Sequence, residues 1–176
     1  MPTVDTGADL AVSQRQTDFL RQHQDTASQA ELQSGIPAAF MVAQAAHESG
    51  WGRHEIKNSD GSTSFNVFGI KAGGSWKGPT TEITTTEVID GQARKVKAKF
   101  RAYGSYAESF ADYAKLMKDS PRYAQISAKA NSKTGDAGAQ FAMGLQKAGY
   151  ATDPAYADKL TKVINTTLRL QRSLVA

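Results

Sequence analysis

Apolar positions recur along the chain with two different periods, and the change of period divides it into helical segments and one hairpin. Spacings of three and four residues predict helices over about residues 13–33, 37–48, 105–117, 136–148 and 153–170, with a further short helix starting at Pro121. Residues 80–101 instead alternate between two faces on either side of Asp90-Gly91, which predicts a β-hairpin with a two-residue turn. The expected fold is therefore α+β and mostly α.

The same pattern indicates how the chain is organised into domains. Residues 1–13 are small and polar, and we expect a disordered or frayed N-terminal segment there. Residues 14–172 form one predicted domain, because 176 residues suffice for a single core and no internal repeat is present. Residues 49–79 are rich in glycine and hold both tryptophans, which is typical of a loop that presents aromatic side chains.

Composition narrows the classes of function without choosing one. The net charge of +4 suits an anionic partner, which can be nucleic acid, a membrane surface or an acidic wall polymer. The absence of cysteine excludes disulfides and thiolate metal sites. No apolar run approaches the ~20 residues of a membrane-spanning helix, so we expect no membrane span. The first residues lack the basic-then-apolar layout of a signal peptide.

Motifs for metal, nucleotide and serine chemistry fail on inspection. A zinc-protease helix needs a second histidine four residues after the first, but Trp51 and Asn58 occupy the positions that follow His47 and His54. The glycine-rich stretch GIKAGGSWKG lacks the Lys-Ser/Thr pair of a phosphate loop, and no serine lies in a G-x-S-x-G elbow. We therefore expect no metal and no cofactor, which leaves carboxylates as the candidate catalytic groups.

Glu48 is the first of these carboxylates. At 100° per residue it continues the stripe of Ala38, Met41 and Ala45, which is the face of the second helix that should meet the core. Partial burial there would raise the pKa of the carboxyl, and the negative end of the helix dipole would act in the same direction. A raised pKa suits a general acid, while a frayed and solvated helix end is an equally open interpretation.

Glu87 is the second candidate, because the predicted hairpin places it on the apolar face. With a two-residue turn at Asp90-Gly91, Glu87 shares the face of Ile83 and Thr85, whereas Glu82 faces Lys99 on the basic side. Glu82 is therefore expected to be a solvated ion-pair partner that contributes little. Because hairpin tips are exposed to water, a solvated Glu87 opposite Arg94 remains the alternative.

Two acids from separate elements, with aromatic residues between them, favour glycoside hydrolysis. One carboxyl protonates the leaving oxygen, and the other activates water or serves as nucleophile. Aromatic faces can support sugar rings, although most aromatic residues of any domain belong to its core. We expect about two of the five candidates to bind substrate, and these candidates are Trp51, Phe68, Trp76, Tyr103 and Tyr150.

Four segments carry a specific resemblance, in consistent order over about residues 15–168: PAAFMVAQAAHESGWG, SFNVFGIKAGGSWKGPTTEITTTEV, KFRAYGSYAESFADY and AGYATDPAYADKL. They closely resemble the catalytic domain of flagellar peptidoglycan hydrolases in the glucosaminidase family. This resemblance implies a lysozyme-like helical domain with a hairpin lobe beside the substrate cleft. It also implies that Glu48 is the general acid, Glu87 the second acid and Tyr150 an active-site tyrosine, and that Asn66 and Phe68 belong to the cleft motif.

The resemblance further implies an activity and a setting. The activity is that of an endo-β-N-acetylglucosaminidase that cuts the GlcNAc-β-1,4-MurNAc bond of peptidoglycan. We expect glycan strands as the substrate, a monomer in the periplasm, no nucleic acid, and flagellar rod proteins as partners only through a region that this chain has no room for. Rival interpretations are a lytic transglycosylase or muramidase of the same fold and a non-catalytic wall-binding module.

One expectation concerns the hairpin as a whole. An isolated two-stranded hairpin is only marginally stable in water, and one face of this hairpin is basic and rich in threonine. We therefore expect its tip to stand open without ligand and to bring Glu87 toward Glu48 when glycan is bound.

Overall fold

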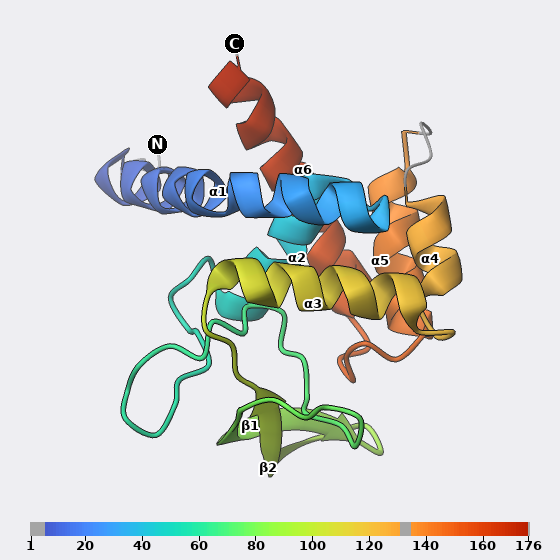
Figure 1. Cartoon of the computed structure of the whole chain (residues 1–176). Coiled ribbons are helices and arrows are strands. Elements are labelled where there is room, and N and C mark those ends of the chain that lie inside the picture. Colours follow the sequence, from blue (N-terminus) through green and yellow to red (C-terminus); the bar gives the residue numbers. More distant parts are fainter. Residues whose placement is uncertain (1–5, 131–134, 176) are drawn as a thin grey trace.

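Helices surround a single core, and one antiparallel hairpin stands apart from them (Figure 1). The computed structural model describes residues 6–130 and 135–175, and within these ranges no helix combines the length and the apolar character needed to cross a bilayer. The elements follow the order α1 (Thr6–Ser34), α2 (Ala38–Ser49), β1 (Thr80–Ile89), β2 (Gln92–Arg101), α3 (Tyr106–Asp119), α4 (Ala124–Lys129), α5 (Ala137–Lys147) and α6 (Tyr156–Val175).

Helix α2 forms the centre of the helical part. Apart from Gln44, its residues from Ala39 to Ala46 are apolar, and the whole of this segment is buried, as expected for a helix without a polar face. In Figure 1 it passes behind α1 and α3. It ends because Gly50, Trp51 and Gly52 all adopt positive φ angles, of 58°, 58° and 85°. Glu48 therefore lies on the last turn, immediately before the chain leaves the helix.

Polar side chains bind backbone amides just before α3 and just before α6. The hydroxyl of Ser105 accepts a hydrogen bond from the amide of Glu108 at 3.1 Å, as a capping box predicts. The carboxylate of Glu108 reaches one residue further back and accepts from the amide of Gly104 at 2.6 Å. Before α6, Asp153 accepts from the amide of Ala155 at 2.8 Å. The Ser105 cap explains why α3 starts where the sequence indicates. Helix α6 starts later than expected, at Tyr156, after the turn that Asp153 forms.

The hairpin has the predicted turn and register. Asp90 and Gly91 have φ angles of 53° and 76°, the two positive values that a tight hairpin turn requires. Ile83 pairs with Ala98, Glu82 with Lys99 and Glu87 with Arg94, as expected. Along β1, exposed residues alternate with half-buried ones up to Glu87, so the inner and outer faces are also confirmed.

Several helix boundaries differ from the sequence expectation. Helix α1 begins at Thr6, so residues 6–13 are helical rather than frayed, while residues 1–5 lie outside the described part. No glycine or proline interrupts the chain between Gly7 and Gly35, and the exposed residues 12–15 carry no apolar period that would reveal the extension. Helix α4 starts at Ala124, after a turn at Pro121, and α6 continues to Val175.

Candidate active site

A cleft of about 790 Å³ separates the hairpin from the helices. The inner face of β1 forms one wall, the α5–α6 loop (residues 149–153) forms another, and Glu48 lies at the end of α2 within it. A cleft of this size can hold a ligand of several rings. Its walls come from segments far apart in the sequence.

Glu48 is held closely from two sides. Its Oε1 accepts a hydrogen bond from the hydroxyl of Tyr156 at 3.1 Å. On the other side is Gly69, where a Cβ atom would lie 3.2 Å from Glu48 Oε2 and where φ is +65°. A side chain at position 69 would be strained and would crowd the carboxyl group, so glycine is required there. Glu48 itself is only partly exposed.

The environment of Glu48 favours its protonated form. Burial raises the pKa of Glu48 to about 7, the hydrogen bond from Tyr156 acts in the opposite direction, and the charge of Glu87 adds to the increase. The partial burial expected from the helical stripe is therefore confirmed, and the solvated helix end is not what the structure contains. A carboxyl group with such a pKa can donate a proton near neutral pH.

A buried chain of polar groups orients Tyr156. Gln44 donates to the Tyr156 hydroxyl at 3.3 Å, and the hydroxyl of Tyr113 in turn donates to Oε1 of Gln44. These residues come from α2, α3 and α6, so the position of the Tyr156 hydroxyl is fixed by three helices at once. Because the Tyr156 hydroxyl receives a hydrogen bond, its own hydrogen points to Glu48.

Glu87 lies on the opposite wall in the opposite charge state. Its Oε1 binds Nζ of Lys71 at 2.6 Å, and its Oε2 accepts from the hydroxyl of Thr152 at 2.8 Å. Burial raises the pKa of Glu87, but the hydrogen bonds from Lys71 and Thr152 and the charge of Lys71 outweigh it, so the pKa lies below its usual value. One carboxyl of the cleft thus favours the neutral form and the other the ionised form.

Tyr150 forms part of the cleft wall. Its hydroxyl donates to the backbone carbonyl of Phe68 at 2.6 Å, and its ring lies between those of Tyr123 and Tyr156, at centroid distances of 5.9 and 6.1 Å. Burial raises the pKa of Tyr150 well above its usual value. The hydroxyl therefore stays neutral and anchors the backbone next to Gly69, the residue whose missing side chain leaves room for the Glu48 carboxyl group.

Two of the predicted substrate-binding residues pack inside the protein. Phe68 is fully buried and stacks on Tyr113 with a centroid distance of 4.1 Å. Asn66 is buried as well, and its side-chain amide donates to the carbonyls of Ile70 and Arg101 at 2.9 and 2.8 Å. Their side chains shape the loop beside the cleft and do not line it.

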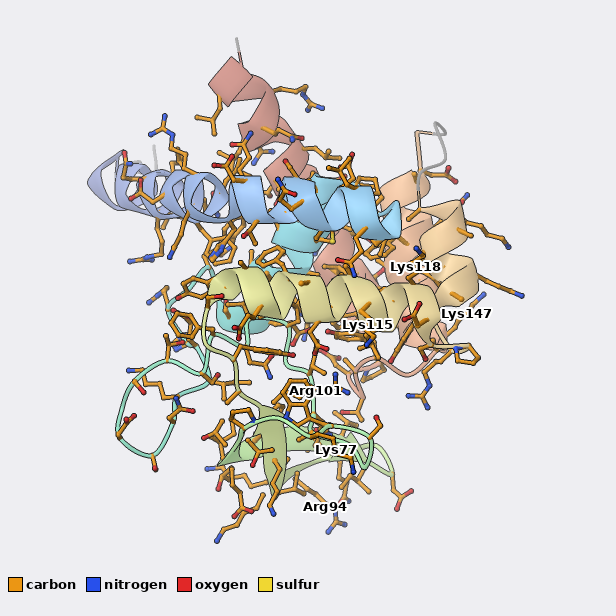
Figure 2. The ribbon with its side chains drawn as sticks, viewed as in Figure 1. Lys77, Arg94, Arg101, Lys115, Lys118 and Lys147 are labelled. Carbon is orange, nitrogen blue, oxygen red and sulfur yellow. The ribbon has the colours of Figure 1, made fainter. Side chains whose placement is uncertain are left out.

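Three of the other predicted aromatic residues, Tyr103, Trp76 and Trp51, also lie outside the cleft. Tyr103 donates to Asp112 at 2.5 Å, and Trp76 packs edge-on against Tyr103 and donates from its indole to the carbonyl of Pro79 at 2.8 Å. Arg101 stacks over Trp76 and lies between the hairpin and α3 (Figure 2). Trp51 lines a separate groove of about 450 Å³ beside α1. Their placement supports structural roles, for Trp76 and Tyr103 at the base of the hairpin and for Trp51 beside α1.

The hairpin tip is seated against the helical part, which differs from the open tip that we expected. The hydroxyl of Thr152, which donates to Glu87, also accepts a hydrogen bond from the backbone amide of Val88 at 3.0 Å. The α5–α6 loop that carries Thr152 hangs below α5 on the side of the hairpin (Figure 1). This contact joins residues 64 positions apart, which a strand pattern alone does not reveal.

Several cleft residues were not predicted from the sequence. Tyr156, Lys71 and Thr152 contact the two acids, and His47, whose pKa is lowered by burial and by the charge of Lys159, also lines the cleft. The one usable signal was the proximity of Thr152 and Tyr156 to Tyr150 in the segment AGYATDPAY. Over residues 6–130 and 135–175, no three histidine, aspartate or glutamate side chains gather as metal ligands would.

Comparison with known proteins identifies the class to which this fold belongs. The chain belongs to the glucosaminidase family, since the family model described as mannosyl-glycoprotein endo-beta-N-acetylglucosaminidase matches residues 24–169. Within it, the chain is similar to peptidoglycan hydrolase FlgJ of Salmonella typhimurium strain LT2, with 49% identity over 164 residues, which cover 93% of this chain and 50% of that protein. FlgJ of Escherichia coli O157:H7 is 52% identical over 146 residues, which cover 83% and 45%. The chain thus spans about half the length of the curated relatives it matches.

Solved structures agree with this assignment. A C-terminally truncated glycoside hydrolase domain of Salmonella typhimurium FlgJ superposes with a TM-score of 0.69 and 51% identity, over 88% of this chain and 98% of that one. A mutant peptidoglycan hydrolase from Sphingomonas sp. A1 gives a TM-score of 0.79 and 45% identity, over 89% and 99%. The chain is a glycoside hydrolase of the mostly helical, lysozyme-like kind, and the resemblance seen in the sequence is confirmed.

Proposed function

We propose that this chain is an endo-β-N-acetylglucosaminidase that cuts the GlcNAc-β-1,4-MurNAc bond of peptidoglycan. The observation that carries the proposal is the pair of carboxyl groups in one cleft. Glu48, with a pKa of about 7, faces a cleft whose other wall holds Glu87 with a lowered pKa. Glycosidases use such a pair, one member as acid and the other as carboxylate.

The two acids take different roles in the reaction. Protonated Glu48 donates its proton to the glycosidic oxygen, so that the sugar on that side leaves as an alcohol. Ionised Glu87 stabilises the positive charge that develops at the anomeric carbon. Water supplies the new hydroxyl group at that carbon, and its remaining proton passes to a carboxylate. The charge states expected of the two groups at the start match these roles.

In this proposal Tyr150 helps to position the backbone beside Glu48. Its hydroxyl is hydrogen-bonded to the carbonyl of Phe68, so it holds the Phe68-Gly69 backbone against Glu48. The same ring forms part of the cleft surface, where it can contact a sugar. Asn66 acts further out, by pinning Ile70 to the end of β2.

Peptidoglycan as substrate also fits the charge of the surface. Peptidoglycan is acidic through the carboxylates of its stem peptides, and this chain carries a formal charge of +4. Basic side chains occur on the hairpin side, at Lys77 and Arg94, and on the helices, at Lys115, Lys118 and Lys147 (Figure 2). We further propose that the chain acts in the periplasm as a monomer and serves flagellar rod assembly, which its similarity to the peptidoglycan hydrolases named FlgJ favours.

Product analysis of Glu48→Gln beside the wild type tests the proposal. Wild-type digests of purified peptidoglycan should contain fragments with GlcNAc at the reducing end, detected by mass spectrometry. Because an amide cannot donate the proton, the variant should lose about 10²–10⁴-fold in rate. Anhydro-MurNAc products would identify a lytic transglycosylase, and MurNAc at the reducing end a muramidase. A variant within a few-fold of the wild type would exclude Glu48 as the acid, and an inactive wild type would favour a wall-binding module.

A further inference from the structure

The carboxylate of Glu87 has both of its oxygens engaged by residues from two other segments. Lys71 binds Oε1 at 2.6 Å and Thr152 binds Oε2 at 2.8 Å. Neither belongs to the hairpin. The Glu87 side chain retains only 17% of its exposure, whereas the side chain of Lys71 is 55% exposed and Thr152 lies at the surface. The hairpin therefore carries the acid, and two exposed residues of the surrounding cleft wall determine where that acid points.

Thr152 makes a second contact that involves the hairpin backbone. In an antiparallel pair, hydrogen-bonded and non-hydrogen-bonded residue pairs alternate. Ile89 and Gln92 flank the two-residue turn, so the next pair, Val88 with Ala93, is of the non-bonded kind and the Val88 amide points away from β2. Thr152 supplies the missing acceptor at 3.0 Å. One hydroxyl thus binds the edge of the hairpin and the acid beside it.

Lys71 is brought to Glu87 by the sheet-like packing of its own loop. The amide of Arg101 donates to the carbonyl of Ile70 at 3.0 Å, and the amide of Ala72 donates to the carbonyl of Lys99 at 2.9 Å. Lys71 therefore forms an isolated antiparallel bridge with Phe100. This bridge places the lysine beside β2, from where its side chain reaches along the inner face of the hairpin to Glu87.

We propose that Lys71 and Thr152 are positioning residues for Glu87. Thr152 binds the hairpin tip to the α5–α6 loop and binds Oε2 of Glu87, while Lys71 binds the other carboxylate oxygen, Oε1. The inference rests on the proposed function in treating Glu87 as the second acid. It adds that Glu87 supports catalysis only while the hairpin tip is bound to Thr152. A loop residue 65 positions away in the sequence therefore controls the turnover number of the enzyme.

Hydrogen exchange at the Val88 amide tests the contact without reference to activity. Thr152→Val removes the hydroxyl at similar volume, and Thr152→Ser keeps it. Amide exchange at Val88, followed by NMR, should accelerate about 10-fold or more in Thr152→Val, because one hydrogen bond is lost, and should stay near the wild-type rate in Thr152→Ser. Thr84→Val, on the exposed outer face of β1, is the matched control and should leave exchange unchanged. Equal protection of Val88 in Thr152→Val would overturn the proposal.

Kinetics on peptidoglycan test whether the contact acts through Glu87. Thr152→Val and Lys71→Met should each lower kcat by about 10-fold, the range expected for a lost hydrogen bond to a charged group, with KM nearly unchanged. The conservative variants Thr152→Ser and Lys71→Arg should keep kcat near the wild-type value. In a Glu87→Gln background, Thr152→Val should have no further effect on kcat. An equal loss in both backgrounds would show that Thr152 does not act through Glu87. Failure of the proposed function would appear separately, as a silent Glu48→Gln.

Discussion

Glu48 shows how opposing contacts set the charge state of a single residue. Burial and the charge of Glu87 raise its pKa, whereas the hydrogen bond from Tyr156 lowers it, and the balance lies at about 7. Near neutral pH the group is therefore divided between a form that can donate a proton and an ionised form that the cleft solvates poorly. The same arrangement makes the ionised group unfavourable for folding.

Glu48→Gln should therefore stabilise the protein at alkaline pH. The folded-state pKa of about 7 exceeds the unfolded value of 4.5, so wild-type stability is full below pH 4.5 and falls as pH rises through 7. Glutamine has no charge to desolvate and can still accept the hydrogen bond from Tyr156. The free energy of unfolding of the variant should exceed that of the wild type by on the order of 3 kcal/mol near pH 8 and by little near pH 4.

Denaturant unfolding of both proteins at the two pH values measures this gap. A constant difference across pH would mean that Glu48 is not destabilised by ionisation in the folded state. In that case the catalytic role proposed for Glu48 would carry no cost in stability.

The pH dependence of catalysis should follow the same two groups. Because Glu48 must be protonated, kcat/KM for peptidoglycan should fall as pH rises through about 7. Because Glu87 must be ionised and its pKa is lowered, the acidic limb should lie below the ordinary value of 4.5 for this carboxyl. Rates measured from about pH 3 to 9 should trace a bell shape. A rate that keeps rising above pH 8 would exclude Glu48 as the proton donor.

At this scale the sequence predicts the positions of the two candidate acids better than the identity of the residues that contact them. Glu48 could be found because its helical stripe is local, with Met41 and Ala45 fully buried on the same face. Tyr156, Lys71 and Thr152 could not, because each meets its acid through contacts between distant segments. The aromatic candidates Trp76 and Tyr103 were assigned to the wrong environment. The sequence does not distinguish an exposed aromatic ring that binds a sugar from one that packs against other side chains.

Among the elements, the hairpin is the one whose internal geometry the sequence predicts most completely. A side-chain period of two and an Asp-Gly turn are enough to derive its register and its two faces. The contact of its tip with Thr152 was not predicted, because nothing in the sequence of an edge strand indicates which residue accepts a hydrogen bond from its outward-facing amide. Helix α1 was predicted too short for a related reason: residues 12–15 are exposed and lack the apolar period.

The two faces of β1 predict different outcomes for two glutamates. Glu87→Gln should lower turnover by about 10²-fold, because an amide cannot supply the negative charge. Glu82→Gln should stay within about twofold of the wild type, as expected for an exposed position that pairs with Lys99 on the outer face. Steady-state hydrolysis of labelled peptidoglycan compares them. Equal losses at both positions would show that the hairpin presents its other face to the substrate.

In the molecule as a whole, the hairpin is attached to the helices at its base and at its tip. At the base, Arg101 binds Asp112 of α3 at 2.9 Å, and Tyr103 donates to the same carboxylate oxygen. Both charged side chains of this ion pair are largely buried, with 12% and 18% exposure. The tip contact at Thr152 is exposed. The base should therefore contribute to stability and the tip to catalysis.

Asp112→Ala should test the contribution of the base. It leaves the Arg101 guanidinium without its carboxylate, which should cost on the order of 2 kcal/mol of the free energy of unfolding. Asp119→Ala, an exposed position on the last turn of the same helix, is the matched control and should change stability by less than about 0.5 kcal/mol. Urea denaturation of both variants measures the difference. Equal stabilities would mean that the ion pair contributes nothing to holding the lobes together.

The alternation along β1 also restricts how the length of this hairpin can vary among related chains. Glu87 lies seven positions after Thr80, where the strand begins, and each residue added between them turns every later side chain to the opposite face. A single insertion there would direct Glu87 to the lysine side unless a bulge absorbed it, whereas two inserted residues would restore its orientation. Natural and engineered hairpins that keep an acid at this position should therefore lengthen in steps of two residues.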